Sequence, residues 1–211
     1  MSVDPFILRA WASGRSIARG LAPPRSEYGG LRIDTNSDAE VRRWVFPKLG
    51  AGIGELARSI NEPRYFLKLC GEADDLRSVL PSVWSLHPAS YFMRASRAHV
   101  ERPLAAGYRI EIRRVGPVVE VRVFSEADML AASGYGVETE DAFVYDRIVT
   151  GEEHRRQGLG HVVMAALQRQ KVSSSVPELL VATEQGRALY ASLGWQVISP
   201  YSTASITVPE G

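Results

Sequence analysis

The 211-residue sequence has little cysteine, no excess of charge and no long apolar run. Its one cysteine, Cys70, excludes an internal disulfide and favours a reducing compartment. Lysine and arginine total 25 against 24 acidic residues, a balance that predicts neither a nucleic acid nor an anionic membrane as partner. No apolar run approaches the roughly 20 residues of a membrane-spanning helix, and the N-terminal segment is not built like a signal peptide. We therefore expect a soluble, cytoplasmic protein.

Several motifs that carry chemistry are also absent. The 4 histidines are scattered and, together with Cys70, give no spacing of metal ligands, so no metal site is expected. There is no Gly-Lys-Ser/Thr, which argues against a nucleotide-triphosphate loop, and no third glycine at the dinucleotide-binding spacing. Ser173 to Ser175 lie in a predicted loop that lacks the setting of a nucleophile.

The first hundred residues read as an alternating α/β region. Asp4 as N-cap and Pro5 at the first helical position predict a helix to about Arg19. Helices are expected at 38–46 (ending before Pro47), 53–60 and 72–80, and extended segments at 31–34, 64–70, 84–86 and 91–94. The aromatic segments 84–86 and 91–93 fill a core or line an acceptor pocket, and we prefer the core.

A polar stretch broken by Pro103 suggests a boundary, which divides the chain into residues 1–98 and 99–211. Strands are expected at 108–113, 118–124, 129–137 and 142–149. They run into the segment 150–171, in which Arg155, Gly158 and Gly160 precede a long amphipathic helix. The first N–H groups of a helix lack partners and carry partial positive charge, and glycine lets a bulky anion approach them. The turn therefore predicts a phosphate or pyrophosphate ligand.

The order of motifs after this turn points to a family. A short strand at 178–183, a helix at 186–194 with the sequence Gly-Arg-Ala-Leu-Tyr-Ala-Ser-Leu-Gly, and a strand at 195–198 follow it. This order, together with Arg-x-x-Gly-x-Gly, resembles the GNAT superfamily of acetyl-CoA-dependent N-acyltransferases. The resemblance is close from about residue 145 to 198. It implies an α/β (α+β) fold with a mixed, mostly antiparallel sheet flanked by helices, here preceded by an N-terminal α/β region.

The resemblance also implies a cofactor site. Acetyl-CoA would be the co-substrate, with its pyrophosphate on the backbone and side chains of the turn. The strand before the turn would pair with the pantetheine arm as if with another strand, and one arginine farther on could reach a phosphate. The residues implied are Ile148, Val149, Thr150, Arg155, Arg156, Gln157, Gly158, Leu159, Gly160 and Arg187.

Two residues are candidates for the chemistry. By resemblance, Tyr190 protonates the departing thiolate, although a tyrosine in a short helix is often a packing residue. Asp146 is placed where several family members have a base, and Val144, Asp146, Ile148 and Thr150 are expected to share one face, with Arg147 pointing the other way. A half-buried carboxylate there could have a raised pKa. A structural ion pair explains Asp146 equally well, and in many such enzymes the amine proton leaves through water.

Alternatives stay open. A GNAT core ordinarily has one strand and two helices where this sequence connects two strands almost directly. Either residues 31–60 supply these elements, or residues 1–98 form a separate, degenerate GNAT-like half, which we prefer. The favoured function is direct transfer of an acetyl group from acetyl-CoA to a primary amine. A non-catalytic acyl-CoA-binding or regulatory protein is the alternative. The acceptor and the oligomeric state cannot be read from the sequence.

Overall fold

The computed structural model describes residues 2–96 and 102–206, and the expected boundary between residues 98 and 99 lies outside them. The helices and strands are α1 (Pro5–Ala18), β1 (Arg25–Glu27), β2 (Gly30–Asp34), β3 (Arg42–Phe46), α2 (Ala51–Ser59), β4 (Tyr65–Cys70), α3 (Ala73–Val79), β5 (Trp84–Leu86), β6 (Ser90–Ala95), β7 (Tyr108–Val115), β8 (Val118–Ser125), β9 (Leu130–Glu138), β10 (Phe143–Thr150), the 3-10 turn η1 (Glu152–His154), α4 (Leu159–Gln168), β11 (Glu178–Thr183), α5 (Glu184–Ser192) and β12 (Trp195–Ile206).

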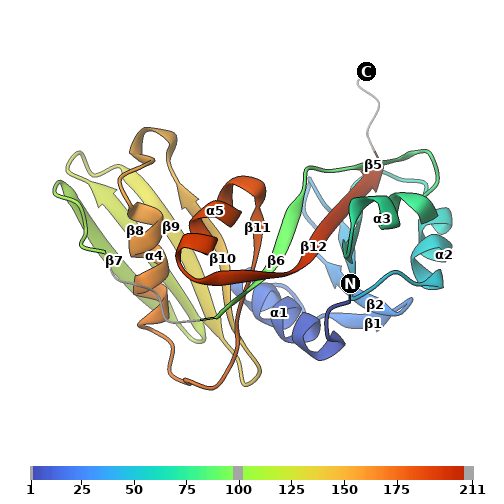
Figure 1. Ribbon diagram of the computed structural model, residues 1–211, viewed down its shortest axis with the longest axis horizontal. Coiled ribbons are helices and arrows are strands. Elements are labelled where there is room, and N and C mark those ends of the chain that lie inside the picture. The colour runs from blue at the N-terminus through green and yellow to red at the C-terminus, as the bar shows by residue number, and fades with distance from the viewer. Residues whose placement is uncertain (1, 97–101, 207–211) are drawn as a thin grey trace.

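The strands form one 12-stranded sheet with a similar arrangement in its two halves. In each half an antiparallel pair, β2–β3 or β9–β10, is followed toward the centre by a parallel pair, β3–β4 or β10–β11. The order is β1-β2-β3-β4-β12-β6-β11-β10-β9-β8-β7, with β5 paired to β12. β3 and β4 are parallel with α2 between them in sequence, and β10 and β11 are parallel with α4 between them. At the centre, β12 pairs with β4 and β6, and β6 pairs with β11. Each half of the chain thus contributes a strand to the other, and Figure 1 shows β6 and β12 crossing between them.

Helix α1 covers one face of the sheet and α4 covers the other. On β10, Val144 packs in a cluster with α1, whereas Phe143 and Tyr145 pack in a cluster with α4. Adjacent side chains of a strand point to opposite faces, so the two helices lie on opposite sides. A Cβ on Gly14 of α1 would lie 2.6 Å from a methyl carbon of Val144, so glycine allows this close approach. The α1 cluster includes residues from β2, β3, β10 and β11, and it therefore joins both halves.

Most expected elements are confirmed. Asp4 caps α1 by accepting a hydrogen bond from the N–H of Phe6 at 2.8 Å. Phe92 and Met93 are buried, and Trp84 is also buried, as preferred for a core. The expected fold class, a mixed and mostly antiparallel sheet flanked by helices, is confirmed. No helix in the described ranges is long and apolar enough to cross a membrane.

Two local expectations are wrong. The segment carrying Trp44 and Val45 is strand β3, not a helix, because its alternating side chains pack against opposite faces and it pairs with both β2 and β4. The expected strand at 195–198 continues to Ile206, because its second part pairs with β4 of the other half. Both differences come from partners distant in sequence.

Candidate functional site

The turn between β10 and α4 has the backbone shape of an anion-binding nest. Arg156 and Gly158 both have left-handed conformations, with φ of 64° and 77°. Gly158 is the N-cap of α4 and has no side chain to satisfy the free N–H groups behind it. Left-handed residues that alternate along a turn aim successive N–H groups into one concavity.

These N–H groups have no partner among the residues that the structure describes. In the described ranges, no backbone or side-chain acceptor binds the N–H groups of residues 156–160. The next two, those of His161 and Val162, donate to the carbonyl of Gly158 at 3.0 and 3.2 Å. The positive end of the α4 dipole adds to the field at the same place. The expected phosphate-binding turn thus has a group of free donors at a helix N-terminus.

The side chains around the nest leave it open to solvent. Arg155, Arg156 and Gln157 are exposed, and Arg155 lies 3.4 Å from Glu152. A Cβ on Gly158 would meet nothing within 4 Å, whereas one on Gly160 would lie 2.9 Å from Leu189 of α5. Gly160 therefore lets α4 and α5 approach each other, and Leu159, next to it, is buried in the core. Gly158, in contrast, allows the left-handed backbone conformation that the turn requires.

Strands β10 and β11 separate beside this turn. They pair only at Phe143 with Glu178 and at Val144 with Leu179, although β10 continues to Thr150 and β11 to Thr183. The backbone of Ile148, Val149 and Thr150 is therefore unpaired on the side of β11. The equivalent strands of the first half, β3 and β4, stay paired over all of β3. Of the two parallel pairs, the one in the second half opens into a wedge.

Tyr190 lies on α5 in the core cluster under α4, with 7% of its surface exposed. Its ring is 6.1 Å from that of Trp195. Burial raises the pKa of the Tyr190 phenol, and the negative charge of Asp146 raises it further. No group in residues 2–96 or 102–206 accepts a hydrogen bond from this hydroxyl. A phenol whose pKa is raised stays protonated and can donate a hydrogen bond to a developing negative charge, although it is a weaker acid than an unperturbed phenol.

Asp146 differs from the expectation. Arg19 donates to its carboxylate at 2.7 and 3.0 Å, and Arg15 donates at 3.4 Å. Burial acts to raise the pKa of Asp146, but the hydrogen bond from Arg19 and the charges of Arg15, Arg19 and Arg147 outweigh it, so that the pKa is lowered. The expected raised pKa is wrong because α1, far away in sequence, supplies two arginines.

The expected face of β10 is also wrong. A bulge between Asp146 and Val149 puts Arg147 in a left-handed conformation with φ of 52°. The alternation breaks there, so Ile148 packs on the α4 side while Asp146 faces α1. Arg147 turns toward Asp146, at 3.3 Å from its carboxylate, rather than away from it.

Arg187 is exposed on α5 and is engaged by its own surroundings. It lies 2.7 Å from Glu184 and stacks over the ring of Tyr91 at 4.4 Å. An anion would have to compete with Glu184 for it. Among the described residues, no group of histidine, cysteine and carboxylate side chains could hold a metal ion.

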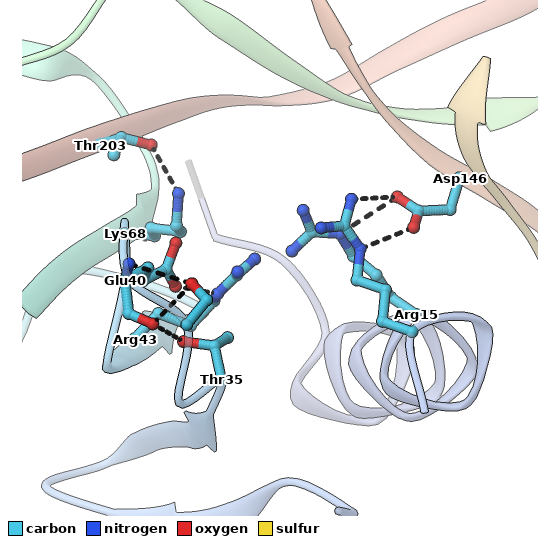
Figure 2. A network of polar contacts seen from close by, with 9 residues as sticks. Arg15, Thr35, Glu40, Arg43, Lys68, Asp146 and Thr203 are labelled. Atoms are coloured by element: carbon cyan, nitrogen blue, oxygen red, sulfur yellow. Dashed lines mark hydrogen bonds and ion pairs between the residues drawn. The ribbon is translucent and has the colours of Figure 1, made fainter. Parts of the chain in front are cut away.

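The structure also brings together cationic residues that sequence reasoning missed. Arg15 of α1 and Arg19, the C-cap of α1, bind Asp146, and Arg43 of β3 and Lys68 of β4 lie on the same face of the sheet. Figure 2 shows Arg15 with Asp146 and, across from them, Arg43 and Lys68. Their positions in the sequence share no spacing, so no pattern could have found them. Only the alternation on β3 and β4, once both are known to be strands, puts Arg43 and Lys68 on the same face.

Comparisons with known proteins agree with this geometry at the level of the fold. No family model and no curated protein matches the sequence. A GCN5-related N-acetyltransferase structure from Kribbella flavida matches 100% of this chain and 97% of its own at 13% identity and a TM-score of 0.67. A putative GNAT-family acetyltransferase from Novosphingobium aromaticivorans matches 96% and 97% at 15% identity and a TM-score of 0.56. A tandem GNAT protein from the clavulanic acid biosynthesis pathway matches 97% and 95% at 14% identity and a TM-score of 0.51. The chain therefore has the GNAT acetyltransferase fold.

Proposed function

We propose that the protein transfers an acetyl group from acetyl-CoA to a primary amine. The observation that carries this proposal is the set of free N–H groups at residues 156–160, beside the open wedge between β10 and β11. A pyrophosphate needs several donors at close range, and a helix N-terminus in a nest offers them. The exposed guanidinium groups of Arg155 and Arg156 add positive charge there.

The wedge supports the second part of the cofactor site. An extended chain of amides can pair with an unpaired strand edge as an additional strand. Ile148, Val149 and Thr150 provide such an edge next to the nest, so the pantetheine arm would run along it. Leu159 and Gly160 start the helix that closes one side, while Gln157 and Arg187 lie at the exposed rim.

The chemistry follows from direct attack. The amine nitrogen bonds to the carbonyl carbon of the thioester, the carbon–sulfur bond breaks, and the sulfur leaves as a thiolate. We assign the proton for this thiolate to the Tyr190 hydroxyl, which then regains a proton from solvent; its raised pKa keeps it protonated before the transfer. Asp146 is held as an anion by arginines, so we propose that it positions them and that the amine's own proton leaves through water.

We also propose that the first half of the chain is a degenerate GNAT-like half. The nearly mirrored sheet order supports this proposal, since β3, α2 and β4 take the places of β10, α4 and β11. Because β3 and β4 stay paired, we assign acetyl-CoA to the second half alone.

Calorimetric titration with acetyl-CoA, with ATP as a control, tests the proposal. We expect micromolar binding of acetyl-CoA and none of ATP, followed by thiol release when amines are supplied. Absence of acetyl-CoA binding would remove the proposal. Binding without thiol release for any amine would favour the alternative, a non-catalytic acyl-CoA-binding protein. The ion pairs of Asp146 are consistent with that alternative, because they make this carboxylate a poor base.

A further inference from the structure

A group of charged side chains lies on the α1 face of the sheet, where the two halves of the chain meet. Figure 2 shows Arg15 and Asp146 on one side of this group and Glu40, Arg43 and Lys68 on the other. We call it the central cluster. Its cations are Arg15, Arg19, Arg43, Lys68 and Arg147, and its carboxylates are Glu40 and Asp146.

The carboxylates of the central cluster are already engaged. Asp146 binds Arg19, Arg15 and Arg147, and Glu40 forms an ion pair with Arg43. Lys68 has no carboxylate within ion-pair distance among the described residues. Its ammonium group donates only to the Thr203 hydroxyl, at 3.4 Å, and lies 5.3 and 5.9 Å from the rings of Phe66 and Tyr201. The cationic excess is therefore not balanced by carboxylates of the described residues.

This excess is unfavourable in the absence of a ligand. Burial, with further repulsion from Arg43, lowers the pKa of Lys68 to about 7, and burial also lowers the pKa of Arg15 to about 10. Lys68 and Arg15 are half-buried, so each cation loses part of its hydration, and an unpaired charge that does so destabilises the fold. An anion that entered the central cluster would pair with these cations and remove the free-energy cost of leaving them unpaired. The same interaction would bind the anion.

A buried hydroxyl and a small cavity mark the place. Tyr201 is 4% exposed, and its hydroxyl has no hydrogen-bond partner among the described residues. The Tyr201 ring lies 5.9 Å from the ammonium group of Lys68 and 5.7 Å from the ring of Trp11, over which Arg15 lies at 5.4 Å. Arg15, Arg19 and Arg43 line a cavity with room for the centre of about one water molecule. An unpaired buried donor beside cations calls for an acceptor with negative charge.

We propose that Arg15, Arg43, Lys68 and Tyr201 form a binding site for a carboxylate group, and that this carboxylate belongs to the amine acceptor. A carboxylate matches the planar fork of a guanidinium group. The cavity holds about one water molecule and is lined by Arg15 and Arg43 but not by Lys68 or Tyr201, so a carboxylate would enter by moving the arginine side chains apart. Asp146 contacts Arg15 and also begins the bulge of β10 beside the wedge, so an acceptor held here would direct its other end toward the proposed acetyl site. The acceptor assignment rests on the proposed acetyl transfer, whereas the carboxylate site does not.

Thermal unfolding of the full chain tests the carboxylate site without acetyl-CoA. We expect sodium acetate to raise Tm more than sodium chloride at equal ionic strength, and acetamide to have no such effect. Equal shifts with acetate and chloride would overturn the site. A larger shift with inorganic phosphate than with acetate would overturn its assignment to a carboxylate.

Lys68→Met separates ligand binding from a purely structural role. Without ligand the variant should have a higher Tm than the wild type, because a half-buried cation without a carboxylate partner is gone, yet it should lose most of the acetate-induced shift. Tyr201→Phe should also reduce that shift. Arg58→Met is the matched control, since Arg58 is exposed on α2 outside the cluster, and it should keep the full shift. A full acetate shift in Lys68→Met would contradict the proposal.

Thiol-release assays test the acceptor. Each amino acid of a panel is compared with its own carboxamide. For at least one amino acid we expect a KM about tenfold or more lower than that of its carboxamide, because the carboxamide lacks the charged hydrogen bond. Lys68→Met should abolish this preference without weakening acetyl-CoA binding. Equal KM values for every pair would overturn the acceptor assignment. No thiol release with any amine, with the acetate effect intact, would remove the acetyl transfer and leave the carboxylate site standing.

Discussion

Asp146 and Tyr190 are both buried, but their surroundings have opposite consequences for proton transfer. Three arginines keep the Asp146 carboxylate ionised and lower its pKa, which makes it a poorer base. Tyr190 has no such cation partner in the part of the chain that the structure describes, and burial raises its pKa, which keeps the phenol protonated. Burial alone therefore does not indicate which of two groups can transfer a proton, and the charges within reach decide it.

Tyr190→Phe should lower turnover by about 10²-fold, in the range of general acid catalysis, and change acetyl-CoA affinity little. The ring remains in place and only the proton donor is lost. Steady-state thiol release and calorimetric titration measure the two effects. Tyr145→Phe is the control, because it removes another tyrosine hydroxyl from the same core cluster, one that donates to Glu178 at 2.6 Å. Equal turnover of the Tyr190 variant and the wild type would make Tyr190 a packing residue.

Lys68 should make stability depend on pH. Its pKa falls from 10.5 in the unfolded chain to about 7 in the folded one, so between these values the unfolded state binds more protons. The free energy of unfolding should therefore rise as pH rises from 7 to 10.5. Lys68→Met should flatten this rise by roughly 1–3 kcal/mol, because each pKa unit is worth about 1.4 kcal/mol and partial solvent access reduces the effect.

Urea unfolding at pH 7 and pH 9.5 measures the Lys68 effect. The charged and polar groups around its ammonium group stay present in the variant. They are Arg15, Arg19, Glu40, Arg43, His87, Tyr201 and Thr203. Lys48→Met is the matched control, since Lys48 is exposed, and its pH dependence should equal that of the wild type. An unchanged slope in Lys68→Met would mean that Lys68 is solvated.

At the scale of elements, the turn before α4 combines a conformational requirement with a binding role. Gly158→Val should lower acetyl-CoA affinity by tenfold or more, because a branched side chain fills the open space above the free N–H groups and opposes φ of 77°. The strain itself should destabilise the fold by about 1–2 kcal/mol. Titration calorimetry and urea unfolding measure both quantities.

Gly116→Val provides the comparison for the Gly158 variant. Gly116 has φ of 56° with nothing within 4 Å of a Cβ, and it lies in the β7–β8 turn. It should show similar destabilisation and unchanged affinity. If both glycine variants bound acetyl-CoA equally well, the nest would not be the pyrophosphate site.

The local elements of the site could be predicted from the sequence, and its geometry could not. Glycine content and helix periodicity are local properties, so the turn, α4 and α5 were found where the structure has them. The bulge at Arg147 left no local signal, and it moved Ile148 to the opposite face from Asp146. The segment of β3 was predicted as a helix because capping residues precede it, whereas pairing on both edges makes it a strand.

At the scale of the whole molecule, β6 and β12 determine how the halves depend on each other. β6 belongs by sequence to the first half but pairs with β11 and β12, and β12 pairs with β4. Such pairing joins residues at least 85 positions apart in the sequence, so no short-range pattern predicts it. The central cluster has the same origin, because α1, β3, β4 and β10 all contribute to it.

Because β6 and β12 each pair with a strand of the other half, we expect the chain to unfold in one transition. Removing β6 would leave β11 without a partner on one edge, and removing β12 would do the same to β4, so neither half should persist alone. Hydrogen exchange measured by mass spectrometry at rising urea concentrations should show β4 and β9 losing protection at the same midpoint. A fragment of residues 102–206 should show no protected strands, because β6 is missing between β11 and β12. Separate midpoints for β4 and β9, or a folded fragment, would mean that each half is stable without the strand it receives.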